Sequence, residues 1–281
     1  VTEGTGDGVI VVTPNISDFD AAQLYQANIT LTEATTGDSK QIPVELGLDK
    51  HYLFSSQPTV SLSKLANINA TSKSLTINTN SPTAVNWLAT SDVDWLTLTK
   101  TSNSKELLVS VKAGASFTEA QNNAVITINA IDDEGMIDES VVAETISLSY
   151  YQSDETSEKV TLEEITANNN ALINSPLLPH VYIGINNQLN VYHQYTGELL
   201  STLDISPAET LLEQLIVHPN GKMLLVKADE TIVAEDETTS VLTHRYQINL
   251  VDNSVTELTD STIEYEPIQF VSFSGRHFVV T

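Results

Sequence analysis

The chain has 281 residues, 41% of them hydrophobic, which is enough to bury the cores of about two domains and excludes a disordered tail. Its 37 acidic residues against 12 Lys and Arg give a net charge of −25, so nucleic acids and anionic lipid surfaces are not expected partners. There is no Cys, which excludes disulfides and thiolate metal sites, and no apolar run reaches the roughly 18 residues of a membrane-spanning helix.

Strand signals dominate the chain. Short runs that alternate apolar and polar residues, or are rich in β-branched ones, recur between small polar residues. The predicted strands are Val9–Val12, Ala27–Leu31, Ser74–Asn78, Trp95–Leu98, Leu107–Val111, Ala124–Asn129 and Thr145–Tyr150. One short helical connector is predicted at Ser206–Leu215, where Ser206, Pro207 and Glu209 fit the positions of a capping box. The chain is therefore expected to be all-β.

A repeat divides the first half of the chain at an offset of about 100 residues, the size of an Ig-like sandwich. Ala27-Asn-Ile-Thr-Leu31 recurs as Ala124-Val-Ile-Thr-Ile128, but the first copy lacks whatever precedes Leu108 in the second. We therefore expect residues 1–54 to be the C-terminal half of one sandwich and residues 55–155 to be a complete one. Half a sandwich cannot bury its inner face, so preceding residues or another subunit would supply the missing strands.

A second repeat, with a period of about 55 residues, occupies the last third. Val217–Val226 resembles Ser272–Val280, and each contains a predicted hairpin turn, Pro219–Gly221 and Ser274–Gly275, because Asn and Gly accept positive φ. Residues 156–281 are expected to form the first roughly two blades of a β-propeller. Closure needs at least about four blades, so the predicted propeller is incomplete.

The segment Asn86-Trp-Leu-Ala-Thr-Ser-Asp-Val-Asp-Trp-Leu-Thr-Leu-Thr99, with the apolar strands that follow it, resembles the BACON domain. This is an Ig-like module of bacterial surface and secreted proteins. The resemblance covers residues 55–155 well and 9–50 partially. It departs at Lys100–Ser104, where the family has a Ser/Pro-Gly turn, and at Asn123, where it has Arg. The resemblance implies a carbohydrate-binding module or a plain spacer.

The last third resembles the WD40-like or YVTN-type propellers of surface proteins. Two degenerate motifs carry this resemblance: Tyr195-Thr-Gly-Glu198 after one strand and His218-Pro-Asn-Gly-Lys222 before another. The expected role of such a propeller is that of an interaction domain, and a propeller enzyme whose metal- or carboxylate-based site lies outside this segment is an alternative.

Two aromatic residues are candidate carbohydrate ligands. The ring of Trp87 could stack on the apolar face of a sugar, although burial in the sandwich core is the stronger expectation for it and for Trp95. Tyr150 and Tyr151 are adjacent and point to opposite faces of a strand, so one of them is expected to be exposed. Tyr151 is the second candidate ligand.

An acidic loop, Asp132-Asp133-Glu134, is the candidate Ca²⁺ site, because Ca²⁺ prefers clustered oxygen ligands. Its spacing does not match an EF-hand, and a solvated loop is the stronger expectation. No other metal or cofactor site is expected. The six His form no ligand motif, and there is no G-x-S-x-G elbow, no Cys nucleophile and no P-loop. No catalytic residue is predicted.

These features favour a non-catalytic bacterial protein outside the cell or on its surface, exported by a signal that this chain does not contain. In it, sandwich repeats would act as a spacer for a propeller that binds a protein or glycan. One alternative is the carbohydrate-binding module of a larger glycan-active protein. Another is the subunit of an extracellular filament or other homopolymer, because open sheet edges pair with other chains. No membrane insertion is expected in this segment.

Overall fold

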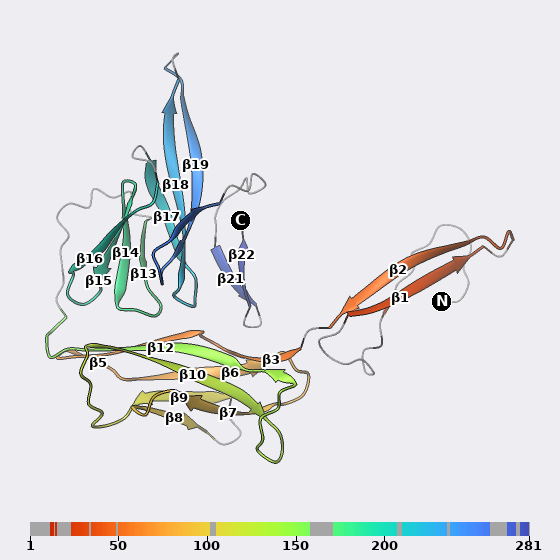
Figure 1. The fold of residues 1–281 in the computed structure, drawn as a ribbon, viewed down its shortest axis with the longest axis horizontal. Coiled ribbons are helices and arrows are strands. Elements are labelled where there is room, and N and C mark those ends of the chain that lie inside the picture. The colour runs from red at the N-terminus through yellow and green to blue at the C-terminus, as the bar shows by residue number, and fades with distance from the viewer. Residues whose placement is uncertain are drawn as a thin grey trace. The chain divides into compact units, whose positions relative to one another are not determined.

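The computed structural model describes residues 12–13, 15, 24–33, 35–48, 50–101, 105–157, 171–206, 210–234, 237–258, 269–273 and 276–280. Every regular element in these ranges is a β-strand, which confirms the all-β class (Figure 1). Two compact units, Val1–His51 and Tyr52–Thr281, are treated separately. No helix in the described ranges is long and apolar enough to cross a membrane. The predicted strand Val9–Val12, apart from Val12, and the predicted turn Ser274–Gly275 lie outside the described residues.

The first unit contains one antiparallel hairpin, β1 (Leu24–Thr32) and β2 (Ser39–Gly47). Its two faces differ because side chains alternate along a strand. One face places Tyr25 opposite Leu46, Ala27 opposite Val44 and Ile29 opposite Ile42. Ile42 is still 39% exposed on this apolar face.

The second unit begins with a sandwich of two five-stranded sheets. One sheet has the order β5-β4-β12-β10-β7 and the other β11-β3-β6-β9-β8. Their strands are β3 (His51–Ser55), β4 (Thr59–Leu65), β5 (Ile68–Ala70), β6 (Ser72–Thr79), β7 (Asn86–Ser91), β8 (Leu96–Lys100), β9 (Glu106–Val111), β10 (Gln121–Ile131), β11 (Val141–Val142) and β12 (Glu144–Gln152). All neighbours within the first sheet are antiparallel except β4 and β12, which are parallel.

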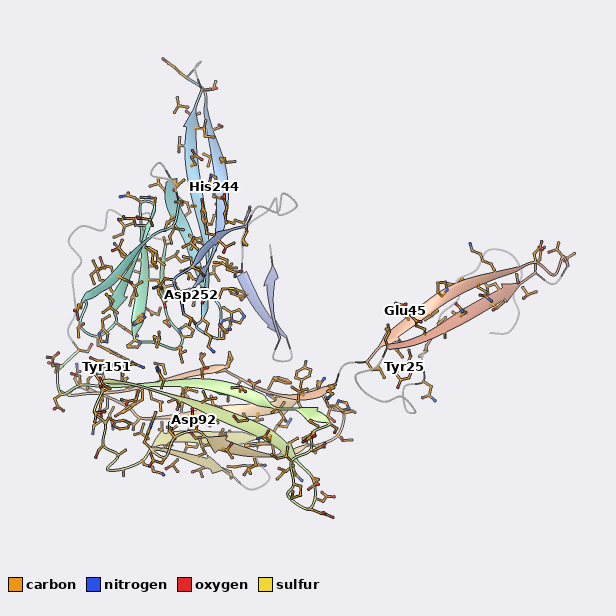
Figure 2. The ribbon with its side chains drawn as sticks, viewed as in Figure 1. Tyr25, Glu45, Asp92, Tyr151, His244 and Asp252 are labelled. Atoms are coloured by element: carbon orange, nitrogen blue, oxygen red, sulfur yellow. The ribbon has the colours of Figure 1, made fainter. Side chains whose placement is uncertain are left out.

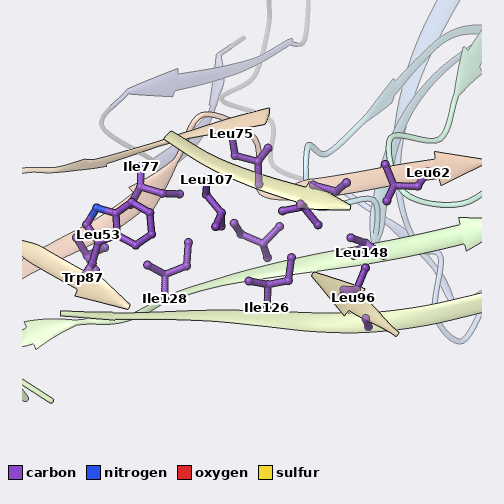
Figure 3. Close-up of a cluster of buried hydrophobic side chains, with 14 of the residues drawn as sticks. Leu53, Leu62, Leu75, Ile77, Trp87, Leu96, Leu107, Ile126, Ile128 and Leu148 are labelled. Atoms are coloured by element: carbon purple, nitrogen blue, oxygen red, sulfur yellow. The ribbon is translucent and has the colours of Figure 1, made fainter. Parts of the chain in front are cut away.

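Alternate residues of both sheets meet in one core (Figure 3). Ile126 on β10 and Leu107 on β9, from opposite sheets, are 0% exposed. Tyr150 points into this core, where its ring lies 5.0 Å from that of Phe117 and 6.0 Å from that of Trp95, centroid to centroid. The predicted alternation of strands 107–111, 124–129 and 145–150 is therefore confirmed.

Two four-stranded antiparallel sheets follow, here called the paired sheets. The first consists of β13 (Leu172–Asn174), β14 (His180–Ile185), β15 (Gln188–His193) and β16 (Leu199–Asp204), and the second of β17 (Thr210–Val217), β18 (Met223–Val233), β19 (Thr239–Asn249) and β20 (Val255–Glu257). In each sheet, the strands lie side by side in the order in which they follow one another along the chain. A further hairpin, β21 (Gln269–Phe273) and β22 (Arg276–Val280), comes last.

The paired sheets share a second core, to which Tyr182 and Leu189 contribute from one sheet and Leu212 and Val226 from the other. Gly184 lets the sheets approach closely. A Cβ at this position would lie 2.7 Å from the Cβ of Ala171 and 2.9 Å from that of Leu212.

The predicted helix at Ser206–Leu215 is wrong. Residues from Thr210 onward form β17, and a register shift between Leu212 and Gln214 marks a β-bulge. The extra residue places Leu212 and Leu215, three positions apart, on the same buried face. The capping-box residues Ser206, Pro207 and Glu209 that predict the helix are a local signal, and they do not determine what the residues from Thr210 onward form.

Both turns that the propeller resemblance singled out are hairpin turns. Gly221 has φ +69° and donates its N–H to the carbonyl of His218 (2.8 Å). Gly197 has φ +71° and donates in the same way to the carbonyl of His193 (2.9 Å). These positive φ values favour Gly in each turn.

Candidate functional site

Part of the outer face of the sandwich sheet that contains β4 and β12 is buried, although the residues there are polar. Thr59, Ser63 and Ser149 alternate with core residues and so point away from the core, yet they are only 6%, 5% and 1% exposed. Small hydroxyl residues cannot be buried by their own strand, so another segment must cover this face.

The covering segments are two turns of the paired sheets. Ser149 Oγ donates a hydrogen bond to the carbonyl of Leu177, between β13 and β14. Thr59 Oγ1 donates to the carbonyl of Pro219, in the β17–β18 turn, at 2.9 Å. The two turns also touch, since a Cβ on Gly221 would lie 2.7 Å from the Cβ of Leu177. The buried hydroxyl groups of Thr59 and Ser149 thus have acceptors in these turns.

Aromatic side chains close one end of this junction. Tyr151, on the outer face of β12, stacks on Tyr195 of the β15–β16 turn, with ring centroids 5.4 Å apart and planes at 21°. His193, the last residue of β15, lies 4.7 Å from Tyr151 by ring centroids. Figure 2 labels Tyr151 at this position. We call the contacts of Thr59, Ser149 and Tyr151 with the paired sheets the junction.

Two His side chains lie beside the junction. His180 and His193 are opposite each other in the β14–β15 register. Burial lowers the pKa of His180, and the neighbouring His193 lowers it further. Burial also lowers the pKa of His193, which Glu198 partly offsets. Both rings therefore favour the neutral form, and Nδ1 of His193 can accept the N–H of Thr196 (3.3 Å).

A third His joins three strands of the second paired sheet. His244 Nδ1 lies 2.8 Å from a carboxylate oxygen of Glu257, and Nε2 lies 3.0 Å from one of Glu230. The hydrogen bond to Glu257 is the main cause of the raised pKa of His244, and the bond to Glu230 adds to it. When it is protonated, the ring can donate to both carboxylates and so link β18, β19 and β20. Nothing in the described ranges gathers three or more groups that could hold a metal ion.

The structure places the two aromatic candidate ligands very differently. Trp87 is 5% exposed and belongs to the sandwich core. Lys100 covers it, with Nζ 4.0 Å from the ring centroid and donating to the Trp87 carbonyl at 2.8 Å. An indole enclosed in this way offers no face to a sugar. Trp95 is half-buried against the same core, and Tyr151 is half-buried in the junction.

The acidic candidate, Asp132-Asp133-Glu134, is an exposed turn between β10 and β11. Asp132 Oδ1 accepts the N–H groups of Glu134 (3.0 Å) and Met136 (2.8 Å), and Gly135 has φ +83°. The carboxylate of Asp132 thus stabilises the turn. The structure does not bring Asp133 or Glu134 together with the aromatic candidates.

Sequence reasoning missed the junction. Ser149 and Thr59 occupy outward positions of their strands, where a short polar residue normally faces water. Only the pairing of β12 with β4 and the return of two distant turns make them interior, and neither is encoded in local periodicity.

No protein-family model and no curated protein matches the chain. Solved structures of sandwich repeats resemble it weakly. Extracellular cadherin domains 1–3 of protocadherin gamma C5 are 12% identical, with 82% of this chain and 78% of that one covered and a TM-score of 0.27. The YadV chaperone is 10% identical, with 73% and 96% covered and a TM-score of 0.29. Domains 1–4 of Drosophila N-cadherin are 14% identical, with 81% and 58% covered and a TM-score of 0.28. Similarity at this level assigns neither a family nor a function.

Proposed function

We propose that this chain is a non-catalytic structural or adhesive protein, on the cell surface or outside the cell, in which the sandwich holds the paired sheets in a fixed position. The observation that carries the proposal is the junction. Buried hydroxyl groups of Thr59 and Ser149 bond to turns of the paired sheets, and Tyr151 stacks on Tyr195. A sandwich on a flexible tether would expose these side chains to water.

The paired sheets are proposed to be the first blades of a β-propeller. Each has four antiparallel strands in chain order, and they pack face to face, as adjacent blades do. The hairpin β21–β22 would begin a third blade. Leu225, on the face opposite the shared core, is 4% exposed, so the second sheet is covered on both faces. The domain limits 55–155 and 156–281 belong to this proposal.

The hairpin β1–β2 is proposed to be the end of another sandwich of the same type. Its sequence resembles β10 and β12, and both pairs are antiparallel with apolar residues on one face. In the sandwich that face is buried, with Ile126 and Ile146 at 0% exposure. Residues 1–54 would then be the C-terminal half of a second sandwich in tandem with the one at residues 55–155.

A carbohydrate-binding role is the second candidate, and it now depends on Tyr151. One face of this ring is occupied by Tyr195, so a sugar would have to reach the half-exposed remainder. A glycan array tests it with Tyr151→Ala against Tyr25→Ala, a Tyr of the separate first unit. If Tyr151→Ala abolishes glycan binding and Tyr25→Ala preserves it, the result would favour a carbohydrate-binding module over a plain spacer.

The proposed role is tested by protease shaving of intact cells, followed by an adhesion assay with beads that carry the chain. Peptides of this chain should be released from the surface. Ser149→Leu should reduce bead retention, because a larger side chain separates the paired sheets from the sandwich. Ser74→Leu, the same change on the exposed outer face of the other sheet, should not. Detection only inside the cell, or equal effects of the two substitutions, would count against the proposal.

A further inference from the structure

Two turns of the first paired sheet contact the sandwich, and each of them begins or ends at a His. His193 is the last residue of β15 and begins the turn that carries Tyr195, whose ring stacks on the sandwich. His180 is the first residue of β14 and ends the turn that carries Leu177, whose carbonyl bonds to the sandwich. The two His are opposite each other in the β14–β15 register. A change of charge on either ring therefore acts at the junction itself.

The turn that begins at His193 depends on an unprotonated ring nitrogen. Nδ1 of His193 lies 3.3 Å from the backbone nitrogen of Thr196 and 3.1 Å from its hydroxyl oxygen. A backbone N–H can only donate, so Nδ1 carries a lone pair here and the proton of the neutral ring lies on Nε2. Protonation of Nδ1 would leave two N–H groups facing each other. The hydroxyl of Thr196 can rotate to accept the new proton, but its backbone N–H cannot, so this turn disfavours the imidazolium.

The titratable groups that face His193 come from three elements. β12 supplies Tyr151, with ring centroids 4.7 Å apart, β14 supplies His180, and the turn itself supplies Tyr195 (5.9 Å) and Glu198. Burial lowers the pKa of His193 more than the carboxylate of Glu198 raises it. Burial also lowers the pKa of His180, and His193 lowers it further. The two Tyr rings can attract a cation, but this attraction does not restore the lost hydrogen bond of the turn.

We propose that the junction is a pH-sensitive switch, in which protonation of His193 releases Tyr195 from Tyr151 and so loosens the sandwich from the paired sheets. The inference deepens the fixed support proposed for the sandwich and rests on it, because it names the condition that releases the support. The pKa of His193 is lowered in the closed junction and should return to about 6.5 when the contact opens. The open form then binds the proton more tightly, so it gains on the closed form as the pH falls below about 6.5.

NMR of the full chain with labelled Tyr and His rings tests the switch. At about pH 7.5, Tyr151 and Tyr195 should share a strong nuclear Overhauser cross-peak, and His193 should show the shifts of the Nε2–H tautomer. At about pH 5 the cross-peak should be at least about fivefold weaker, and its midpoint of loss should coincide with the titration of His193. The indole signal of Trp87 should not shift between the two conditions, because the sandwich core stays folded.

Two results of this titration would overturn the switch. One is a cross-peak that persists while His193 becomes protonated, and the other is a cross-peak that is lost only together with the core signal of Trp87. Either result leaves the support itself intact at neutral pH. A cross-peak that is already absent at about pH 7.5 would contradict the support and the switch together.

Two Asn variants separate the charge of His193 from its place in the turn. His193→Asn keeps an acceptor oxygen close to the position of Nδ1 and never becomes positive, so the cross-peak between Tyr151 and Tyr195 should persist in acid. His218→Asn is the matched control, because Nδ1 of His218 likewise accepts a backbone N–H of its own turn, that of Asn220 (3.1 Å). This control should lose the cross-peak in acid as the wild type does. Equal pH dependence of the cross-peak in the two variants would overturn the proposal.

Discussion

Tyr151, near the end of the last sandwich strand, stacks on Tyr195 in a turn of the first paired sheet, with ring centroids 5.4 Å apart. Its neighbour Tyr150 points the other way, into the sandwich core. One dipeptide thus contributes both to the sandwich core and to the junction, because successive side chains of a strand face opposite sides. The sandwich and the paired sheets should therefore not behave as independent domains.

The first prediction concerns this pair of rings. Tyr151→Ala and Tyr195→Ala should each destabilise the junction, and a double-mutant cycle should give a coupling energy of about 0.5–1.5 kcal/mol. Chemical denaturation of the wild type, the two single variants and the double variant measures this coupling energy. Tyr151→Phe should keep most of the stability, since the stack needs the ring. A coupling energy near zero would mean that the rings are adjacent without stabilising each other.

The second prediction concerns Gly184. Gly184→Ala should cost about 1–3 kcal/mol of stability, because the new Cβ would lie 2.7 Å from Ala171 and 2.9 Å from Leu212. Gly47→Ala, on β2, is the control, because no atom lies within 4 Å of its added Cβ. Thermal unfolding of both variants tests the close approach of the sheets. Equal midpoints of thermal unfolding for the two variants would show that the sheets can move apart around the new Cβ without loss of stability.

The third prediction concerns Trp87, which the sequence suggested as a sugar ligand and the structure places in the core. Trp87→Ala should destabilise the sandwich by about 3–5 kcal/mol. The fluorescence of Trp87, measured in a Trp95→Phe background, should be blue-shifted and resistant to added quenchers. A red-shifted, readily quenched Trp87 would contradict its 5% exposure.

The fourth prediction concerns pH. The folded pKa of His244 is raised, chiefly by the hydrogen bond to Glu257. The stability it contributes is fully present below the unfolded pKa of about 6.5 and is lost as pH rises through the folded value. The His244 side chain is 17% exposed and that of Glu257 46%, so screening should limit the contribution to about 1 kcal/mol or less.

His180 and His193 have the opposite sign, because burial lowers their pKa values. Their contribution to the stability of the fold is present above the unfolded pKa. It is lost as pH falls from the unfolded pKa to the lower folded pKa. The substitution His244→Gln separates the pH-dependent contribution of His244 from that of His180 and His193. Relative to the wild type, this variant should lose more stability at pH 5.5 than at pH 8.5. A difference of the reverse sign would show that the two carboxylates do not hold an imidazolium.

Local patterns predicted much of this fold. Period-two alternation located the strands that contain Ala27, Leu107 and Ile126, and Gly221 of the predicted Pro219–Gly221 turn marked a real hairpin. The capping-box residues before β17 wrongly predicted a helix, because such a local signal does not determine whether the residues after it pair as a strand. The junction could not be predicted at all. Ser149 is interior only because the turn that contains Leu177, 28 residues later, returns to it, and local sequence carries no such information.

The central claim is that the sandwich and the paired sheets form one fixed body, and a distance measurement tests it most directly. The chain has no Cys, so Thr97→Cys on β8 and Ser201→Cys on β16 can carry a pair of spin labels at exposed positions. Double electron–electron resonance should give one narrow distance distribution, which Ser149→Leu broadens and Ser74→Leu leaves unchanged. A broad distribution in the otherwise unaltered chain would contradict the fixed junction.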